Sequence, residues 1–353
     1  MKVKLPVRRE ILERKTYEPP AEGRWGKIRL DFNENTAGCS PAVRRALREL
    51  GEKKIAMYPE VLGGTAKLAR YFGVAPEELV LTNGGDDALR VFFDAFVDKG
   101  SRILICEPTF PMYRYYGEIY GARIDVCRYD DAMGFPLRDV LCALKKKPRV
   151  FFLANPNNPT GTLVPLPQLR KILEAAPRTA VVFDEAYAEY SGLTTTPWTR
   201  KYANLFVART FSKAAGLASL RLGGVIAQTA SLDLVRRAMP PYPINLAGLV
   251  GAVAAVGDQK TLRAHVQEIL RTREWFAKEL RKIGARAFKS AGNFLLADFG
   301  TGGPAIFAQL EKKGILLRDR SNAIAPGFVR IGIGTRREME ILVREIIRLW
   351  EKR

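Results

Sequence analysis

Four short apolar segments in the middle of the chain constrain its fold more than any other feature of the sequence. Each has four or five residues, and none alternates apolar with polar residues. Such runs are typical of parallel strands that are buried on both faces. Because strand-like and helix-like segments alternate here, the sequence predicts an α/β fold with a mostly parallel central sheet. The segments are Arg102–Cys106, Val150–Ala154, Ala180–Phe183 and Leu205–Ala208.

Polar motifs follow three of these segments. Asn158-Pro159-Thr160-Gly161 comes after the second segment and Asp184-Glu185-Ala186-Tyr187 after the third. The fourth is followed by Arg209-Thr210-Phe211-Ser212-Lys213, and Arg221 stands eight residues beyond Lys213. In α/β sheets, ligands bind beyond the carboxyl ends of the strands. We therefore expect these motifs to meet at one site.

The combined side chains match the polar groups of one cofactor, pyridoxal 5′-phosphate. Its aldehyde condenses with a lysine amine, and Lys213 is the candidate, with a second role as a base. Its ring nitrogen needs an acid partner, for which Asp184 is the candidate. A carboxylate there keeps the ring nitrogen protonated, which makes the ring an electron sink.

The remaining polar groups of the cofactor also find candidates. Asn158 and Tyr187 are expected to donate hydrogen bonds to the phenolate oxygen. Arg221 is expected to hold the phosphate bidentately, with the hydroxyls of Thr210 and Ser212 on the same phosphate. Each motif alone has a plainer interpretation: a surface Ser-Lys pair, a salt bridge at a strand end, or a turn. Their combination, in this order, favours the cofactor site.

With these residues in place, the chain resembles the class I and II (fold type I) aminotransferases, and within them the histidinol-phosphate aminotransferase branch. The resemblance implies a mostly parallel sheet sandwiched by helices, a smaller α/β domain, and a homodimer. It also implies ping-pong transfer of an amino group between histidinol phosphate or a similar donor and 2-oxoglutarate or glutamate, in histidine biosynthesis. Further family-like segments are Asn33–Asn35, Tyr58-Pro59, Asn83–Asp87, Pro108–Phe110, Pro241–Pro243, Gly314–Arg318 and Val329–Gly332.

The resemblance adds candidates for the cofactor site. It assigns the amides of Gly85 and Asp86 to the cofactor phosphate, in keeping with glycines at a helix N-terminus. It places Phe110 on the pyridine ring, although core packing is the alternative. Tyr58 is expected to reach the phosphate in the partner subunit's site; its alternative is a packed tyrosine at a helix end.

Four residues are candidates for substrate binding. Arg330 lies in an apolar strand, where an unpaired guanidinium is costly; it is expected to bind an anionic group of the substrate, with a structural ion pair as the alternative. Arg318 is expected to face the same anionic group. Asn33 and Tyr17 belong to segments at the entrance of the site. Asn33-Glu34-Asn35 is followed by Thr36-Ala37-Gly38-Cys39, which departs from the family pattern and leaves the substrate preference open.

The expected domains are a large cofactor-binding domain at 41–255, and a small domain that combines 256–353 with the N-terminal segment 1–40. Ser40-Pro41 predicts a helix start. A long helix is expected over 260–283, ended by Gly284, and a last helix from Arg337. The apolar stretch 244–256 is interpreted as a buried helix. It is shorter than a membrane span.

The net charge and the cysteine content limit which other classes of protein this chain can belong to. The 353 residues include 57 basic and 37 acidic ones, giving a net charge of +20. This charge raises the alternative of a basic nucleic-acid-binding protein, but the basic residues are scattered and no nucleic-acid motif accompanies them. Four cysteines without paired spacing indicate a reducing cytoplasm, and no metal site is expected. Two further alternatives keep the cofactor: an aromatic amino acid aminotransferase, with Phe110 and Phe294 accepting a phenyl ring, and a decarboxylase of a phosphorylated amino acid.

Overall fold

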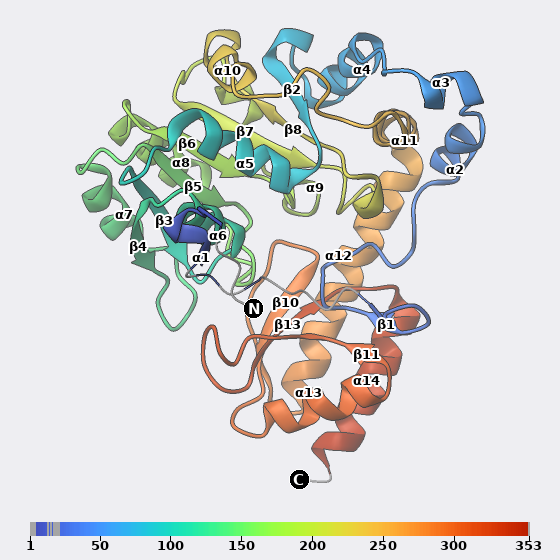
Figure 1. The fold of residues 1–353 in the computed structure, drawn as a ribbon. Coiled ribbons are helices and arrows are strands. Elements are labelled where there is room, and N and C mark those ends of the chain that lie inside the picture. Colours follow the sequence, from blue (N-terminus) through green and yellow to red (C-terminus); the bar gives the residue numbers. More distant parts are fainter. Residues whose placement is uncertain (1–4, 13, 15, 17–21, 352–353) are drawn as a thin grey trace.

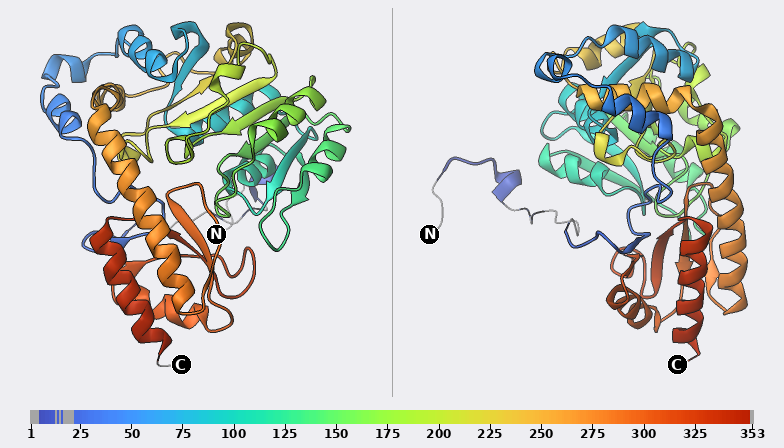
Figure 2. Two further views of the ribbon diagram at one scale, coloured as in Figure 1. Left: turned by 180° about the vertical axis from the view of Figure 1, so that it is seen from behind. Right: turned by 90° about the vertical axis from the view of Figure 1, so that its right-hand side faces the viewer.

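The computed structural model describes residues 5–12, 14, 16 and 22–351. These residues form two main sheets, each with its own helices, and a small two-stranded sheet. The larger sheet and its helices form the upper half of Figure 1, and the C-terminal part forms the lower half. A long helix, α12 (Gln259–Lys282), runs from one half into the other, as the views in Figure 2 also show.

The large sheet has seven strands, of which only β8 runs against the others. The four predicted strands lie next to one another in it, which confirms the parallel sheet. In order across the sheet the strands are β2 (Leu79–Thr82), β8 (Gly223–Ile226), β7 (Leu205–Thr210), β6 (Ala180–Asp184), β5 (Val150–Ala154), β3 (Arg102–Glu107) and β4 (Arg123–Arg128).

Helices cover both faces of this sheet, which is why its central strands are apolar. In β5, for example, Phe151 packs into the core on one face and Phe152 into the core on the other. One face is covered by α5 (Gly85–Phe96), α6 (Met112–Ile119) and α10 (Thr229–Arg236). The other face is covered by α4 (Leu62–Phe72), α7 (Leu137–Leu144), α8 (Leu166–Ala175) and α11 (Leu246–Gly257).

The C-terminal part is built on an antiparallel sheet packed against α12 and two more helices. Its strand order is β12 (Arg318–Asp319), β13 (Phe328–Gly332), β10 (Phe294–Asp298) and β9 (Arg286–Ala287). The N-terminal segment joins this part, because β1 (Ile28–Arg29) pairs in parallel with β11 (Ile315–Leu316). The two further helices are α13 (Gly303–Lys312) and α14 (Arg336–Trp350).

Side-chain caps fix where several helices begin. The Ser40 hydroxyl accepts from the amide of Ala42 at the start of α2 (Pro41–Arg48), as predicted. The same hydroxyl donates to Asp258, which caps α12 through the amide of Thr261. The predicted long helix is confirmed in α12, and α14 begins one residue before the predicted start, where Thr335 and Glu338 form a capping box.

The remaining helices are short. They are α1 (Arg9–Leu12), α3 (Glu52–Ala56) and α9 (Ala188–Ser191), with 3-10 turns at Pro76–Glu78, Thr196–Trp198 and Ala218–Leu220. Within the described part of the chain, no helix has the length and apolar character needed to cross a membrane.

Candidate active site

A cavity of about 320 Å³ lies where the carboxyl ends of the large sheet face the N-terminal segment and the small antiparallel sheet. The structure brings twelve of the predicted site residues to its wall. They come from strands, helix starts and loops between residues 85 and 330, so only the fold assembles them. These residues are Gly85, Asp86, Phe110, Asn158, Asp184, Tyr187, Thr210, Ser212, Lys213, Arg221, Arg318 and Arg330.

Strand order explains why the central residues meet. β5, β6 and β7 are neighbours in parallel register, with Ala154 opposite Asp184 and Asp184 opposite Ala208. Asn158 stands four residues past the end of β5, and Lys213 three residues past the end of β7. Each side chain therefore enters the cavity from the same edge of the sheet.

The Lys213 amine is held at the boundary between the two halves. Its Nζ donates to the carbonyl oxygen of Phe32 at 2.9 Å and lies 5.9 Å from the ring centroid of Tyr187. Phe32 also lines the cavity. Sequence reasoning missed this partner, because a backbone carbonyl leaves no signal in the residue type.

Asp184 is a partly buried carboxylate with a donor on each oxygen. Its Oδ2 accepts from the hydroxyl of Tyr113 at 2.7 Å, and its Oδ1 from the amide of Ala186 at 3.1 Å. Burial raises the pKa of Asp184, and the Tyr113 hydrogen bond opposes that rise. Tyr113 was not predicted, since an aromatic residue in an apolar helix is interpreted first as core.

Asn158 and Tyr187 are oriented by groups from outside the large sheet. The Tyr187 hydroxyl accepts from Asn33 Nδ2 at 3.0 Å, and its ring packs edge-on against Phe294 at 5.0 Å. Asn158 Oδ1 accepts from Arg330 Nη1 at 2.7 Å. The amide NH₂ of Asn158 and the hydroxyl proton of Tyr187 are thus the groups with which these two residues donate to a ligand. Asn33 itself is buried behind Tyr187 and is not on the cavity wall.

The opposite end of the cavity has the features of a phosphate site. The N-terminus of α5 opens there, where Gly84 has a φ of +87°. A Cβ at Gly84 would stand 2.8 Å from Nη2 of Arg221, so only glycine lets the guanidinium approach the helix start. Arg221 also pairs with Asp86 at 3.2 Å. Free helix amides and a guanidinium together suit a phosphate.

A pair of arginines lines the side of the cavity formed by the small sheet. Arg318 in β12 stands directly opposite Arg330 in β13. Arg330 is buried and also donates to the carbonyl oxygen of Asp31. Arg320, two residues further along, lines the cavity as well and was not predicted. The guanidinium of Arg330 also lies 6.0 Å from the ring centroid of Phe294.

Comparison with known proteins decides the family. The family model described as aminotransferase class I and II matches residues 26–346. The chain belongs to this family. Histidinol-phosphate aminotransferase from Anoxybacillus flavithermus is 35% identical over 334 residues, covering 92% of this chain and 89% of the relative. Histidinol-phosphate aminotransferase 1 from Carboxydothermus hydrogenoformans is 33% identical over 336 residues, covering 94% and 95%.

A solved structure supports the cofactor. Histidinol-phosphate aminotransferase from Sinorhizobium meliloti, in complex with pyridoxal-5′-phosphate, superposes with a TM-score of 0.85 at 25% identity, covering 92% of this chain and 91% of that one. The chain is a pyridoxal-phosphate-dependent aminotransferase with the fold type I architecture. The residues of the cavity fit this cofactor: a partly buried carboxylate, a lysine amine, two hydrogen-bond donors and a phosphate cradle are all present.

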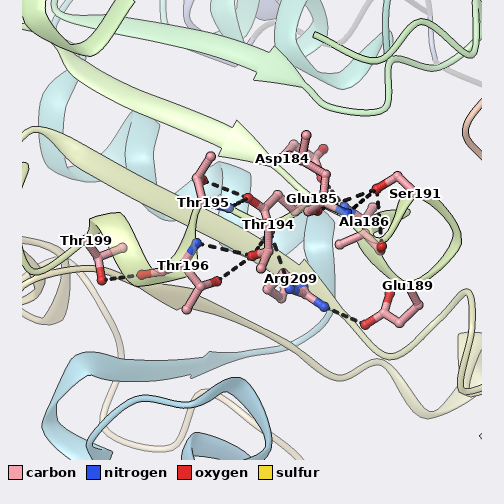
Figure 3. A network of polar contacts seen from close by, with 12 residues as sticks. Asp184, Glu185, Ala186, Glu189, Ser191, Thr194, Thr195, Thr196, Thr199 and Arg209 are labelled. Carbon is pink, nitrogen blue, oxygen red and sulfur yellow. Dashed lines mark hydrogen bonds and ion pairs between the residues drawn. The ribbon is translucent and has the colours of Figure 1, made fainter. Parts of the chain in front are cut away.

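The loop that carries Asp184 is held in this aminotransferase by the buried polar network of Figure 3. The guanidinium of Arg209 contacts Glu185 at 3.4 Å and Glu189 at 2.5 Å. Glu185 also accepts from the amide and hydroxyl of Thr195 and from the hydroxyl of Thr194. Glu185 follows Asp184 directly, so this network ties the end of β6 to the end of β7.

Tyr58 is a predicted cofactor-binding residue that does not line this cavity. Tyr58 is 74% exposed and stacks on Tyr242 with ring centroids 4.1 Å apart. Ile55, Met57 and Leu62 are exposed beside it in the sequence. Tyr17 lies outside the residues that the structure describes.

Proposed function

We propose that the aminotransferase exchanges the amino group of histidinol phosphate with 2-oxoglutarate, and that glutamate is the second amino substrate. The observation that carries this proposal is the opposed pair Arg318 and Arg330 on the cavity wall. Like charges directly opposite each other on a sheet destabilise it. A phosphate or a carboxylate of the substrate can accept charge-assisted hydrogen bonds from both guanidinium groups. The names of the relatives, which are histidinol-phosphate aminotransferases, support the same substrate.

We assign the cofactor groups to the residues that the cavity brings together. Lys213 binds the aldehyde, Asp184 the ring nitrogen, and Asn158 and Tyr187 the phenolate oxygen, while Phe110 covers the ring. The phosphate is bound at the α5 start and its surroundings, by Gly85, Asp86, Thr210, Ser212 and Arg221. When bound, the cofactor supplies an electron sink for the substrate Cα.

The chain's own residues then move the proton. As a free amine, Lys213 would act as the base that takes the proton from the substrate Cα. Tyr187, whose ring lies 5.9 Å from Nζ, flanks this amine. Arg318 and Arg330 fix the far end of the substrate, so that the Cα proton faces Lys213.

Aromatic amino acids are the competing substrates. Phe110, Leu89 and Met112 give the cavity apolar wall for a phenyl ring. Phe294 is fully buried behind Tyr187 and does not line the cavity, so it offers no contact to such a ring.

The experiment is a panel of amino donors with 2-oxoglutarate, measured at low and physiological salt. We expect kcat/KM to be highest for histidinol phosphate and to fall with salt, because charge-assisted contacts are screened. Arg318→Ala should lower kcat/KM for histidinol phosphate by roughly tenfold or more and leave phenylalanine little changed. Arg200→Ala, at an exposed pair with Glu78, is the matched control. A higher kcat/KM for phenylalanine or tyrosine would overturn the proposed substrate.

We further propose a homodimer in which Tyr58 completes the phosphate site of the partner subunit. Its exposure, and the apolar side chains of Ile55, Met57, Leu62 and Tyr242, support a covered surface at this place. We also propose a cytoplasmic location, and a division into a large domain at 41–255 and a small domain formed by 1–40 and 256–353.

A further inference from the structure

Tyr113 is the largest fully buried side chain, and its one described hydrogen bond reaches the active site. It lies in the first turn of α6, and its hydroxyl donates to Asp184 Oδ2 at 2.7 Å across 71 residues of sequence. A buried tyrosine hydroxyl needs a partner. The partner here is the carboxylate on which the cofactor's ring nitrogen is proposed to depend.

The ring of Tyr113 is fixed by aromatic neighbours. It stacks on Phe152 of β5 with centroids 5.3 Å apart and an interplanar angle of 11°. Phe110 packs edge-on against the Tyr113 ring, with ring centroids 5.8 Å apart. Phe152 is itself held by Phe93, which stacks on it with ring centroids 5.1 Å apart. The hydroxyl therefore has one position, and that position is against Asp184.

The contact acts on the charge state of Asp184. A carboxylate has about four acceptor positions, and Tyr113 and Ala186 occupy one on each oxygen. Burial raises the pKa of the Tyr113 hydroxyl well above its ordinary value, so it stays a donor. Since a donor that keeps its proton stabilises the ionised carboxylate, it opposes the desolvation of Asp184.

We propose that Tyr113 is a positioning residue that holds Asp184 ionised and aimed at the pyridine nitrogen. The proposal rests on the proposed role of Asp184. Without the Tyr113 hydroxyl, the pKa of Asp184 rises further, so the carboxyl holds a proton itself and no longer pairs as an anion with a protonated ring nitrogen. The effect should therefore appear only with a ligand whose ring carries that nitrogen.

The test compares two ligands on the cofactor-free full-length protein. One is pyridoxal 5′-phosphate, and the other is its 1-deaza analogue, in which carbon replaces the ring nitrogen. Dissociation constants are measured by fluorescence quenching for wild type, Tyr113→Phe and Asp184→Asn. For Tyr113→Phe we expect roughly tenfold weaker binding of pyridoxal phosphate, the scale of a hydrogen bond to a charged group. Binding of the deaza analogue should stay within about twofold of wild type on the same scale.

Tyr129→Phe is the matched control. Tyr129 is also buried, and its hydroxyl has no hydrogen-bond partner among the described residues. This variant should bind both ligands as wild type does. Equal weakening of both ligands in Tyr113→Phe, or no weakening, overturns the role of Tyr113.

The two proposals fail differently. If wild type binds both ligands equally, or if Asp184→Asn keeps the wild-type preference for pyridoxal phosphate over the deaza analogue, the proposed role of Asp184 is wrong. The proposed role of Tyr113 is then wrong as well. If Asp184→Asn removes the preference but Tyr113→Phe retains it in full, only the role of Tyr113 falls. Circular dichroism of each variant establishes that the measured protein is folded.

Discussion

Arg330 donates from Nη1 to Oδ1 of Asn158 at 2.7 Å, across 172 residues of sequence. Arg330 belongs to the small sheet, whereas Asn158 follows β5 of the large one. The bond occupies the acceptor of the Asn158 side chain and leaves its NH₂ group for a ligand. It thus couples a residue proposed to bind substrate to one proposed to bind cofactor.

Arg330→Ala should therefore weaken the binding of both substrate and cofactor, but not to the same extent. We expect the KM for glutamate to rise roughly ten- to a hundredfold, because hydrogen bonds to a charged group are lost. Cofactor affinity should fall less, through the freed Asn158 amide. Steady-state kinetics and a cofactor titration measure the two effects. Unchanged glutamate kinetics in a folded variant would favour a purely structural role for this arginine.

Lys213→Ala should remove both turnover and the visible absorbance of the bound cofactor, because Lys213 is the only lysine on the cavity wall formed by the described residues. Absorbance spectra and an activity assay check this directly. Lys201→Ala is the control: Lys201 is an exposed residue that packs beside Tyr202. A chromophore and full activity in the Lys213 variant would rule out the assignment.

Asp184→Asn should change how the stability of the cofactor-free protein depends on pH. Burial raises the pKa of Asp184. An acid with a raised pKa contributes stability below its ordinary pKa, and that contribution is lost as pH rises through the raised value. The amide of the variant does not titrate, so the variant does not lose stability in this pH range for this reason. The Tm of the variant relative to wild type should therefore increase from about pH 4 to pH 7. Calorimetry that shows a constant difference would contradict the expectation.

Arg209→Met should strongly destabilise the fold. The guanidinium is buried between Glu185 and Glu189, and removing it leaves both carboxylates without their cation. Breaking such a buried pair costs ~3–5 kcal/mol. Arg200→Met removes an exposed pair with Glu78 and should cost far less, because solvent screens that pair. Urea unfolding of the cofactor-free proteins gives both values. Similar losses in the two variants would mean that the network of Figure 3 adds no special stability.

Mixing two inactive variants tests the proposed role of Tyr58. A dimer of one Tyr58→Ala subunit and one Lys213→Ala subunit contains one site with both wild-type residues. After random exchange of equal amounts, about a quarter of wild-type activity should return, as expected for a two-fold dimer. Each variant alone supplies the baseline. No recovery, despite exchange shown by tagged subunits, would place Tyr58 in its own subunit's site or outside the sites.

Local patterns in the sequence were enough to predict the parallel sheet and the polar motifs that follow its strands. The segments around Phe152 and Val182 are apolar on both faces because helices cover both faces, and that burial is written into every residue of the strand. The start of α2 at Ser40 and the course of α12 were also predictable, since caps and helical periodicity act over a few residues. Because ligands bind beyond the carboxyl ends of strands in α/β sheets, the sequence also predicted that Asn158, Asp184 and Lys213 meet at one edge of the sheet.

Only the tertiary structure determined which groups form hydrogen bonds with each of these residues. Phe32 meets Lys213 through a backbone carbonyl, which no residue type encodes. Tyr113 reaches Asp184 only because α6 packs against the face of β5, and Arg330 reaches Asn158 only because the small sheet closes on the large one. Such contacts join residues far apart in the sequence, and their geometry depends on how whole elements pack. Residue type and periodicity carry information over one helix turn or one strand, and so they cannot specify these contacts.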